Sequence, residues 1–169
     1  MRIIITEEQL RQITESENKR KLMSIPIELF YNKMDAILDN YKKKGFDGIK
    51  LVGDVNFYSV FYMDFDRIFE HIVEIDGNLD LRKSTIKSLG NLEYVGGELD
   101  LRYCEELSDL GNLRYVGEGL FLNKTNITSL KNLEYVGHYL SLSETPLADR
   151  MSIDDIKNKF EIKGEIIRI

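Results

Sequence analysis

The feature that most constrains this fold is a repeat. The pair Leu-x-Leu begins at Leu79, Leu99, Leu120 and Leu140, and further apolar residues follow each pair at nearly constant spacing. A spacing of two places both leucines on the inner face of a short strand, and the later steps of three predict a 3₁₀-like or irregular return. A period this short predicts that each unit forms one turn of a solenoid, in which no unit buries its apolar face alone.

The repeated pattern, Leu-x-Leu-x-x-(Ser, Cys or Thr)-x-Ile/Leu, resembles the leucine-rich repeat over roughly residues 77 to 147. This family usually has Asn or Cys at one position of the repeat, where the side chain hydrogen-bonds to the backbone at the bend. In this sequence that position holds Ser84, Cys104, Thr125 and Thr145. The absence of Asn departs from the family pattern. The resemblance implies an α/β fold, with a short solenoid, a parallel concave sheet and a buried ladder of hydrogen bonds between neighbouring coils.

Degraded copies of the pattern predict five or six coils. Val55 and Phe57 form the inward pair of an earlier strand, followed by a helix whose apolar face includes residues 65 to 72. Gly96 and Gly97 are expected to turn the chain through positive φ. The tyrosine side chains at the same position of successive repeats are expected to stack along one edge as part of the structure: Tyr94, Tyr115 and Tyr135.

The open ends of a solenoid require caps. Residues 1–50 are predicted to be a helical N-terminal cap, with a short helix at 6–13 and a longer one after Pro26 that Gly45 ends. Residues 51–169 are predicted to be the solenoid, with a C-terminal cap from about residue 148. In that cap a helix starts at Ser152 and leads to a final strand in 164–169.

Composition and motifs argue against several functions. A net charge of −6 disfavours broad nucleic-acid binding, and no apolar run is long enough to span a membrane. The single cysteine, Cys104, excludes an intramolecular disulfide and favours the cytoplasm. No phosphate-binding loop or zinc motif occurs, and only His71 and His138 could serve histidine chemistry. We therefore predict no catalytic residue, metal or cofactor, and interpret the acidic pairs at 64–66 and 154–155 as solvated surface or helix caps.

The outward residues of the predicted concave sheet are the candidate site. Asp80 is expected beside Asp100, and Arg82 beside Arg102, with diagonal ion pairs that neutralise the rows. Phe121 lies in the same outward row, near Tyr139, unless a cap loop covers it. Exposed aromatic and arginine side chains are enriched at interface hot spots. The predicted partner-binding residues are therefore Asp80, Arg82, Asp100, Arg102, Phe121 and Tyr139.

These residues predict a non-catalytic module that docks a protein partner. The opening segment, residues 1–13, resembles the start of small proteins of large tailed bacteriophages. That resemblance implies a phage-encoded protein in the cytoplasm of a host bacterium, either an inhibitor of a host protein or a structural or assembly component of the virion. A small metal- or nucleotide-binding protein or enzyme is the rival interpretation. Self-assembly into a dimer is a third.

Overall fold

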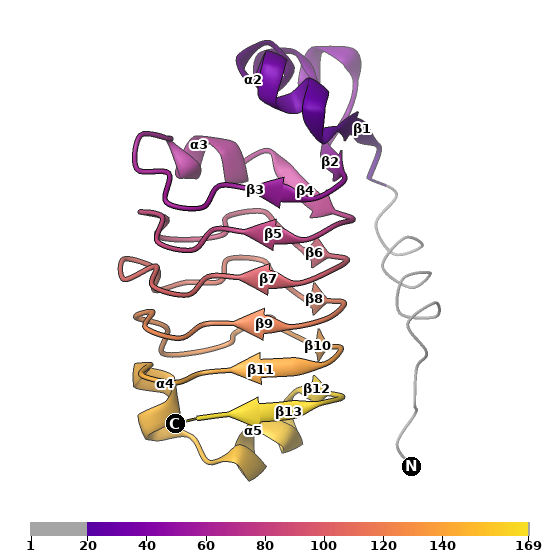
Figure 1. The fold of residues 1–169 in the computed structure, drawn as a ribbon. Coiled ribbons are helices and arrows are strands. Elements are labelled where there is room, and N and C mark those ends of the chain that lie inside the picture. Colours follow the sequence, from indigo (N-terminus) through magenta and orange to yellow (C-terminus); the bar gives the residue numbers. More distant parts are fainter. Residues whose placement is uncertain (1–19, 169) are drawn as a thin grey trace, which may run out of the picture.

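The computed structural model describes residues 20–168 and shows an α/β chain built on two parallel sheets (Figure 1). Every strand pairing between neighbours is parallel, and after the first two strands, which share a sheet, the chain alternates between the sheets as it advances. The seven-stranded sheet contains, in spatial order, β1 (Leu22–Pro26), β2 (Gly48–Val52), β4 (Ile72–Ile75), β6 (Tyr94–Val95), β8 (Tyr115–Val116), β10 (Tyr135–Val136) and β12 (Glu161–Ile162). The six-stranded sheet contains β3 (Val55–Asn56), β5 (Leu79–Asp80), β7 (Leu99–Asp100), β9 (Leu120–Phe121), β11 (Tyr139–Ser141) and β13 (Glu165–Ile167).

The second sheet was not predicted. The return leg of each repeat, expected to be irregular or 3₁₀-like, contains a two-residue Tyr-Val strand that pairs with the same dipeptide of the next repeat. The predicted Leu-x-Leu strands are present, and Leu79 pairs in register with Leu99, which pairs with Leu120. The leucines of the Leu-x-Leu strands and the valines of the Tyr-Val strands are fully buried. The core is therefore a continuous apolar column between two narrow sheets.

The tyrosines of the seven-stranded sheet stack as predicted. The rings of Tyr94 and Tyr115 lie 4.7 Å apart with an interplanar angle of 9°, and those of Tyr115 and Tyr135 lie 4.6 Å apart at 6°. In-register parallel pairing forces this arrangement, because it brings the same side chain of each repeat to the next at strand spacing.

The glycines at the corner after each Tyr-Val strand are needed for a different reason from the one expected. Neither Gly96 nor Gly97 has a left-handed φ, so the prediction of positive φ was wrong. A Cβ built on Gly96 would lie 2.4 Å from the carbonyl oxygen of Asp76, and one on Gly117 would lie 2.0 Å from that of Gly96. Successive backbones approach so closely here that only a residue without a side chain fits.

A line of residues with left-handed conformation lies at another corner, just after the six-stranded sheet. Each is the third residue of a tight turn, as where the Ser84 amide donates to the Leu81 carbonyl over 3.1 Å. The residues in this conformation are not glycine, and their φ values lie between 56° and 63°: Ser59, Lys83, Tyr103, Lys124 and Glu144. Their side chains consequently project from one line of turns.

The small polar residues after these turns are buried, but their hydrogen bonds differ in part from the predicted ladder. Thr125 and Thr145 donate to carbonyls of their own repeats, Leu122 and Leu142, over 2.8 and 2.7 Å. Cys104 alone reaches a carbonyl of the preceding repeat, that of Leu81. The Ser84 hydroxyl also lies 3.6 Å from Cys104 Sγ, so the predicted ladder is present between these two repeats. An unpredicted line of asparagines adds a further bond between repeats, in which the Asn112 side-chain amide donates to Asn91 over 3.1 Å.

The chain before the repeats packs at one end of the stack (Figure 1). The helix predicted after Pro26 is present as α2 (Ile27–Asn40), and a 3₁₀ turn (Lys42–Lys44) follows it and ends at left-handed Gly45. The Tyr31 hydroxyl of α2 accepts from the Asn56 amide over 2.8 Å and donates to the Asn56 carbonyl over 3.2 Å. It thereby occupies edge groups of β3 that would otherwise face solvent. The helix predicted at 6–13 lies outside the described residues, and the boundary predicted at residue 50 falls inside β2.

The remaining helices are short. Of the apolar residues expected on one helix, Phe65, Ile68 and Phe69 lie in α3 (Phe65–Phe69), whereas Ile72 begins β4. At the other end of the stack, the unpredicted α4 (Pro146–Arg150) precedes α5 (Ile153–Lys159), whose capping box joins Ser152 and Asp155 as predicted. None of the helices in residues 20–168 has the length and apolar character needed to cross a membrane.

Candidate functional site

The predicted acidic and basic rows form an ion-pair quartet, defined as Asp80, Arg82, Asp100 and Arg102. The main bonds are within repeats rather than diagonal: Arg82 Nη2 lies 2.6 Å from Asp80 Oδ2, and Arg102 Nη2 lies 2.5 Å from Asp100 Oδ2. One diagonal contact, Arg82 Nε to Asp100 Oδ2 at 3.5 Å, links the two repeats. The spacing of two explains this geometry, because both side chains project from the same face of one strand.

The electrostatics favour the charged forms of Asp80, Arg82 and Arg102. Burial alone would raise the pKa of Asp80, but the hydrogen bonds from Arg82 and the nearby positive charges outweigh it, so the Asp80 pKa is lowered. The bonds to Asp80 and Asp100 likewise raise the pKa of Arg82 and of Arg102. Two carboxylates and two guanidinium groups cancel, so the quartet adds shape and hydrogen-bonding groups to the face but no net charge.

Phe121 and Tyr139 have different surroundings. The Phe121 ring is partly buried against Gly119, where a Cβ would lie 2.7 Å from the ring, and the Arg102 guanidinium lies 5.3 Å from the ring centre. Tyr139 is 47% exposed, and its ring lies 6.2 Å from that of His138. No ring contact joins Phe121 to Tyr139 in the described part of the chain. The two rings therefore do not pack directly against each other.

A second surface next to the quartet was not predicted. We call it the cation–tyrosine column, and it consists of Tyr58, Lys83, Tyr103 and Lys124. The Lys83 ammonium lies 5.7 Å from the Tyr58 ring centre and 5.8 Å from that of Tyr103, and Lys124 lies 5.2 Å from Tyr103. Arg82 of the quartet covers Tyr58 at 5.0 Å, which joins the two surfaces.

The column could not be found from alternation along strands, because three of its members lie in turns. Lys83, Tyr103 and Lys124 occupy the left-handed turn position, one residue beyond the outward rows of the sheet. The signal available in the sequence was the alternation of lysine and tyrosine at this position of successive repeats. It is meaningful only once the turns are known to align.

An aromatic loop, residues 58–63, extends the column beyond the first repeat. Phe61 is 54% exposed and Tyr62 is 99% exposed, the most exposed large hydrophobic side chain among the described residues. Val60 and Met63 of the same loop pack against the core. The loop is thus fixed by two apolar residues while it presents two aromatic rings to solvent.

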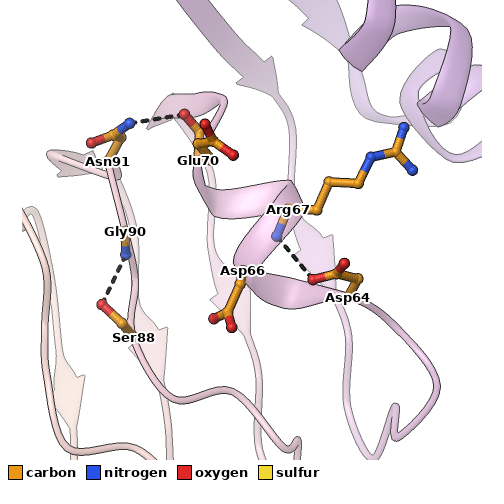
Figure 2. Close-up of a pocket in the computed structure, with 7 residues that line it drawn as sticks. All are labelled: Asp64, Asp66, Arg67, Glu70, Ser88, Gly90 and Asn91. Carbon is orange, nitrogen blue, oxygen red and sulfur yellow. Dashed lines mark hydrogen bonds between the residues drawn. The ribbon is translucent and has the colours of Figure 1, made fainter.

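Two clefts lie beside α3. The larger, about 560 Å³, is shown in Figure 2 and is lined by Asp64, Asp66, Arg67, Glu70, Ser88, Gly90 and Asn91. The Arg67 side chain points away from Asp66 toward α2, where it pairs with Asp35 at 2.7 Å and Asp39 at 3.0 Å. The second cleft, about 210 Å³, shares Asp64 and Asp66 and adds Lys87 and Glu106.

Some of the carboxylates that line these clefts already have a role in the fold. Asp64 is used to cap α3, where it accepts from the Arg67 amide over 3.0 Å. Glu70 lies at the far end of the helix, beside Asn91 (Figure 2). Within residues 20–168, no group of three or more His, Cys, Asp or Glu side chains is arranged to hold a metal ion.

Cys104 and His71 have structural roles. Cys104 is fully buried, and burial raises the pKa of its thiol, which keeps it protonated. His71 lies with its Nδ1 3.0 Å from the buried Tyr41 hydroxyl, and burial lowers its pKa. Both groups belong to the packing of the fold. Comparison with known proteins finds no matching family model, no similar curated protein and no similar solved structure.

Proposed function

We propose that this chain is a leucine-rich-repeat-like solenoid, capped by α2 at one end and by α4, α5 and β13 at the other, that acts as a non-catalytic protein-interaction module. One observation carries the proposal: exposed aromatic rings and cations are interleaved along the outer side of the six-stranded sheet, with Arg82 over Tyr58 and Arg102 over Phe121. Tyrosine and arginine dominate the energetics of protein interfaces because they combine large contact area with directional hydrogen bonds.

The ion-pair quartet suits the polar part of such an interface. Its guanidinium groups are already held by carboxylates and rings, so a partner that docks there meets side chains in fixed positions. Fixed side chains lose little conformational entropy on binding, which favours affinity. The side chains of Arg82 and Arg102 remain 38% and 39% exposed, respectively, so they are still accessible to a partner.

The biological setting rests on the phage-like opening segment, residues 1–13, which lies outside the described residues. We propose that the partner is a protein of the bacterial host, which this chain inhibits in the cytoplasm. A structural or assembly role in the virion is the second candidate and rests on the same segment. The two differ in location: a virion component occurs at fixed stoichiometry in purified particles, and a host-directed factor is absent from them.

The test is affinity capture from lysate of infected bacteria. Wild-type protein is compared with the double variant Arg102→Glu/Phe121→Glu and with a matched control, Lys157→Glu, on α5 at the far end of the stack. Circular dichroism establishes that each variant is folded. The proposal expects one stoichiometric protein that wild type and Lys157→Glu retain and the double variant loses.

Other results would correct the proposal in specific ways. Equal capture by all three proteins would move the interface to another face. Capture of nothing, together with a dimer by light scattering, would favour self-assembly. Capture of nothing by a monomer that binds a divalent metal or a nucleotide in calorimetry would favour the small-ligand alternative.

A further inference from the structure

We propose that the cation–tyrosine column binds an extended acidic segment of the partner protein, with a carboxylate on Lys83 and the flanking side chains against the rings of Tyr58 and Tyr103. The inference rests on the proposed function, because it assumes that the partner is a protein. It differs in location: the binding centre is the line of turns beside the six-stranded sheet, not the quartet on the sheet itself.

The positive charge of Lys83 favours an acidic ligand. Lys83 is exposed, and no carboxylate pairs with it in the described part of the chain. Within residues 77–147 the other cationic side chains each form an ion pair with a carboxylate: Arg82, Lys87, Arg102, Arg114, Lys124 and Lys131. Lys83 is therefore the position in the repeats where an added carboxylate displaces no existing partner.

The two rings give the site its length. Tyr58 and Tyr103 belong to the repeats before and after Lys83, and each is 44% exposed. Parallel strands are about 4.8 Å apart, so the rings are separated by about 10 Å along the stack. An extended peptide advances about 3.4 Å per residue, and about three residues cover that distance. A carboxylate at the centre of such a segment reaches Lys83 while its neighbours reach the rings.

The fixed backbone makes the site rigid. Lys83 and Tyr103 both occupy left-handed turns, and the turns are tied across repeats where the Lys83 amide donates to the Arg102 carbonyl over 3.0 Å. The Tyr103 amide donates in the same way to the Asn123 carbonyl over 2.9 Å. Aromatic anchors held on such a scaffold bind with a small entropic cost.

The surroundings favour an acidic peptide over single-stranded nucleic acid, which also uses alternating rings and cations. A nucleic acid carries a phosphate at every residue, whereas Lys83 is the one Lys or Arg among residues 77–147 that is not paired with a carboxylate. The chain as a whole has a net charge of −6. A segment with one central carboxylate avoids that repulsion, and the exposed rings of Phe61 and Tyr62 offer its apolar residues further contact.

The test selects ligands without assuming a sequence. A displayed library of random linear peptides is panned on the full-length protein, and enriched peptides are synthesised with a fluorescent label. Their dissociation constants are measured by anisotropy with wild type, Lys83→Glu, Lys83→Gln and Tyr103→Ala. The matched control is Lys157→Glu, and labelled oligouridylate is the nucleic-acid probe.

The proposal expects enriched peptides with Asp or Glu beside apolar or aromatic residues. Their binding should weaken about tenfold or more in Lys83→Glu and in Tyr103→Ala, the loss typical of a hot-spot residue. Lys83→Gln should lose less than Lys83→Glu, Lys157→Glu should bind as wild type does, and added salt should weaken binding.

Three results would overturn it. Equal affinity of wild type and Lys83→Glu, with loss in Arg102→Glu/Phe121→Glu, would reject the column and leave the proposed function standing. Tighter binding of oligouridylate than of any peptide, sensitive to Lys83→Glu, would replace the acidic segment by nucleic acid. No enriched peptide would reject the column, while the capture experiment would still decide independently whether the chain binds a protein.

Discussion

Gly117 offers the sharpest test of how tightly the repeats are stacked. We expect Gly117→Ala to destabilise the protein by about 2–3 kcal/mol, because its Cβ would lie 2.0 Å from the Gly96 carbonyl oxygen. A real Cβ needs at least about 3 Å, so the two repeats must separate by about 1 Å. The Gly96 oxygen belongs to the backbone and the new Cβ is bonded directly to the backbone of residue 117, so no flexible side chain could swing aside.

The hydrogen bonds across the same gap set the magnitude. The Gly117 amide donates to the Val95 carbonyl over 2.9 Å, and the Glu118 amide donates to the Gly97 carbonyl over 3.2 Å. Widening the gap by about 1 Å takes both beyond hydrogen-bonding distance, at about 1–2 kcal/mol each. Alanine also lowers the conformational entropy of the unfolded chain, which offsets about 0.4–1 kcal/mol of the lost stability. The net loss corresponds to a decrease in Tm of about 5–10 °C for a chain of this size.

The assay is urea unfolding followed by circular dichroism, with two comparison variants. In Gly119→Ala the new Cβ meets only the Phe121 ring, which is partly exposed and can rotate, so a cost below about 1 kcal/mol is expected. In Gly45→Ala nothing lies within 4 Å, and the left-handed φ of 77° alone should cost about 1 kcal/mol. If Gly117→Ala were no more destabilising than these two, the close-approach explanation of the corner glycines would be refuted.

Three further predictions concern single side chains. The lowered pKa of His71 means that the unfolded chain binds a proton more readily, so the free energy of unfolding should fall as pH drops below about 6.5. His71→Gln should remove that dependence in urea titrations between about pH 7.5 and 5.5. An unchanged dependence of the unfolding free energy on pH would contradict this explanation. Cys104 should fail to react with a thiol reagent until the protein unfolds, and stoichiometric labelling of the folded protein would show that its burial is wrong. Glu144→Asn should raise the free energy of unfolding by about 0.5 kcal/mol, because Asn tolerates the left-handed φ of 56° and the exposed ion pair with Lys124 contributes little. A decrease in the free energy of unfolding would indicate that the ion pair contributes more than the relief of backbone strain.

The sequence pattern was sufficient for the inward leucines and for the strands that contain them. The two leucines of each pair, such as Leu79 and Leu81, are both buried at a spacing of two, which is a local property of strand geometry. The Tyr-Val strands were missed because two residues are too few to show any period. Their strand character comes from pairing with identical dipeptides one repeat away, which is a property of the stack.

The candidate site was predicted less completely for a related reason. Alternation along the strand correctly placed Asp80 and Arg82 together, but it could not tell a pair within one repeat from a diagonal pair, because both lie within side-chain reach. Lys83 and Tyr103 were not recognised because a left-handed turn directs its side chain independently of strand alternation. Such a turn at a non-glycine residue carries little signal in the sequence.

The in-register pairing has a consequence for the length of the molecule. Tyr115 contacts Tyr94 on one side and Tyr135 on the other with nearly the same separation, so successive repeats meet through the same pair of complementary surfaces. A duplicated unit inserted between two existing ones would meet the same neighbours and would add one strand to each sheet. The number of repeats can therefore change in whole units, and each change would lengthen the outer face while leaving both ends as they are.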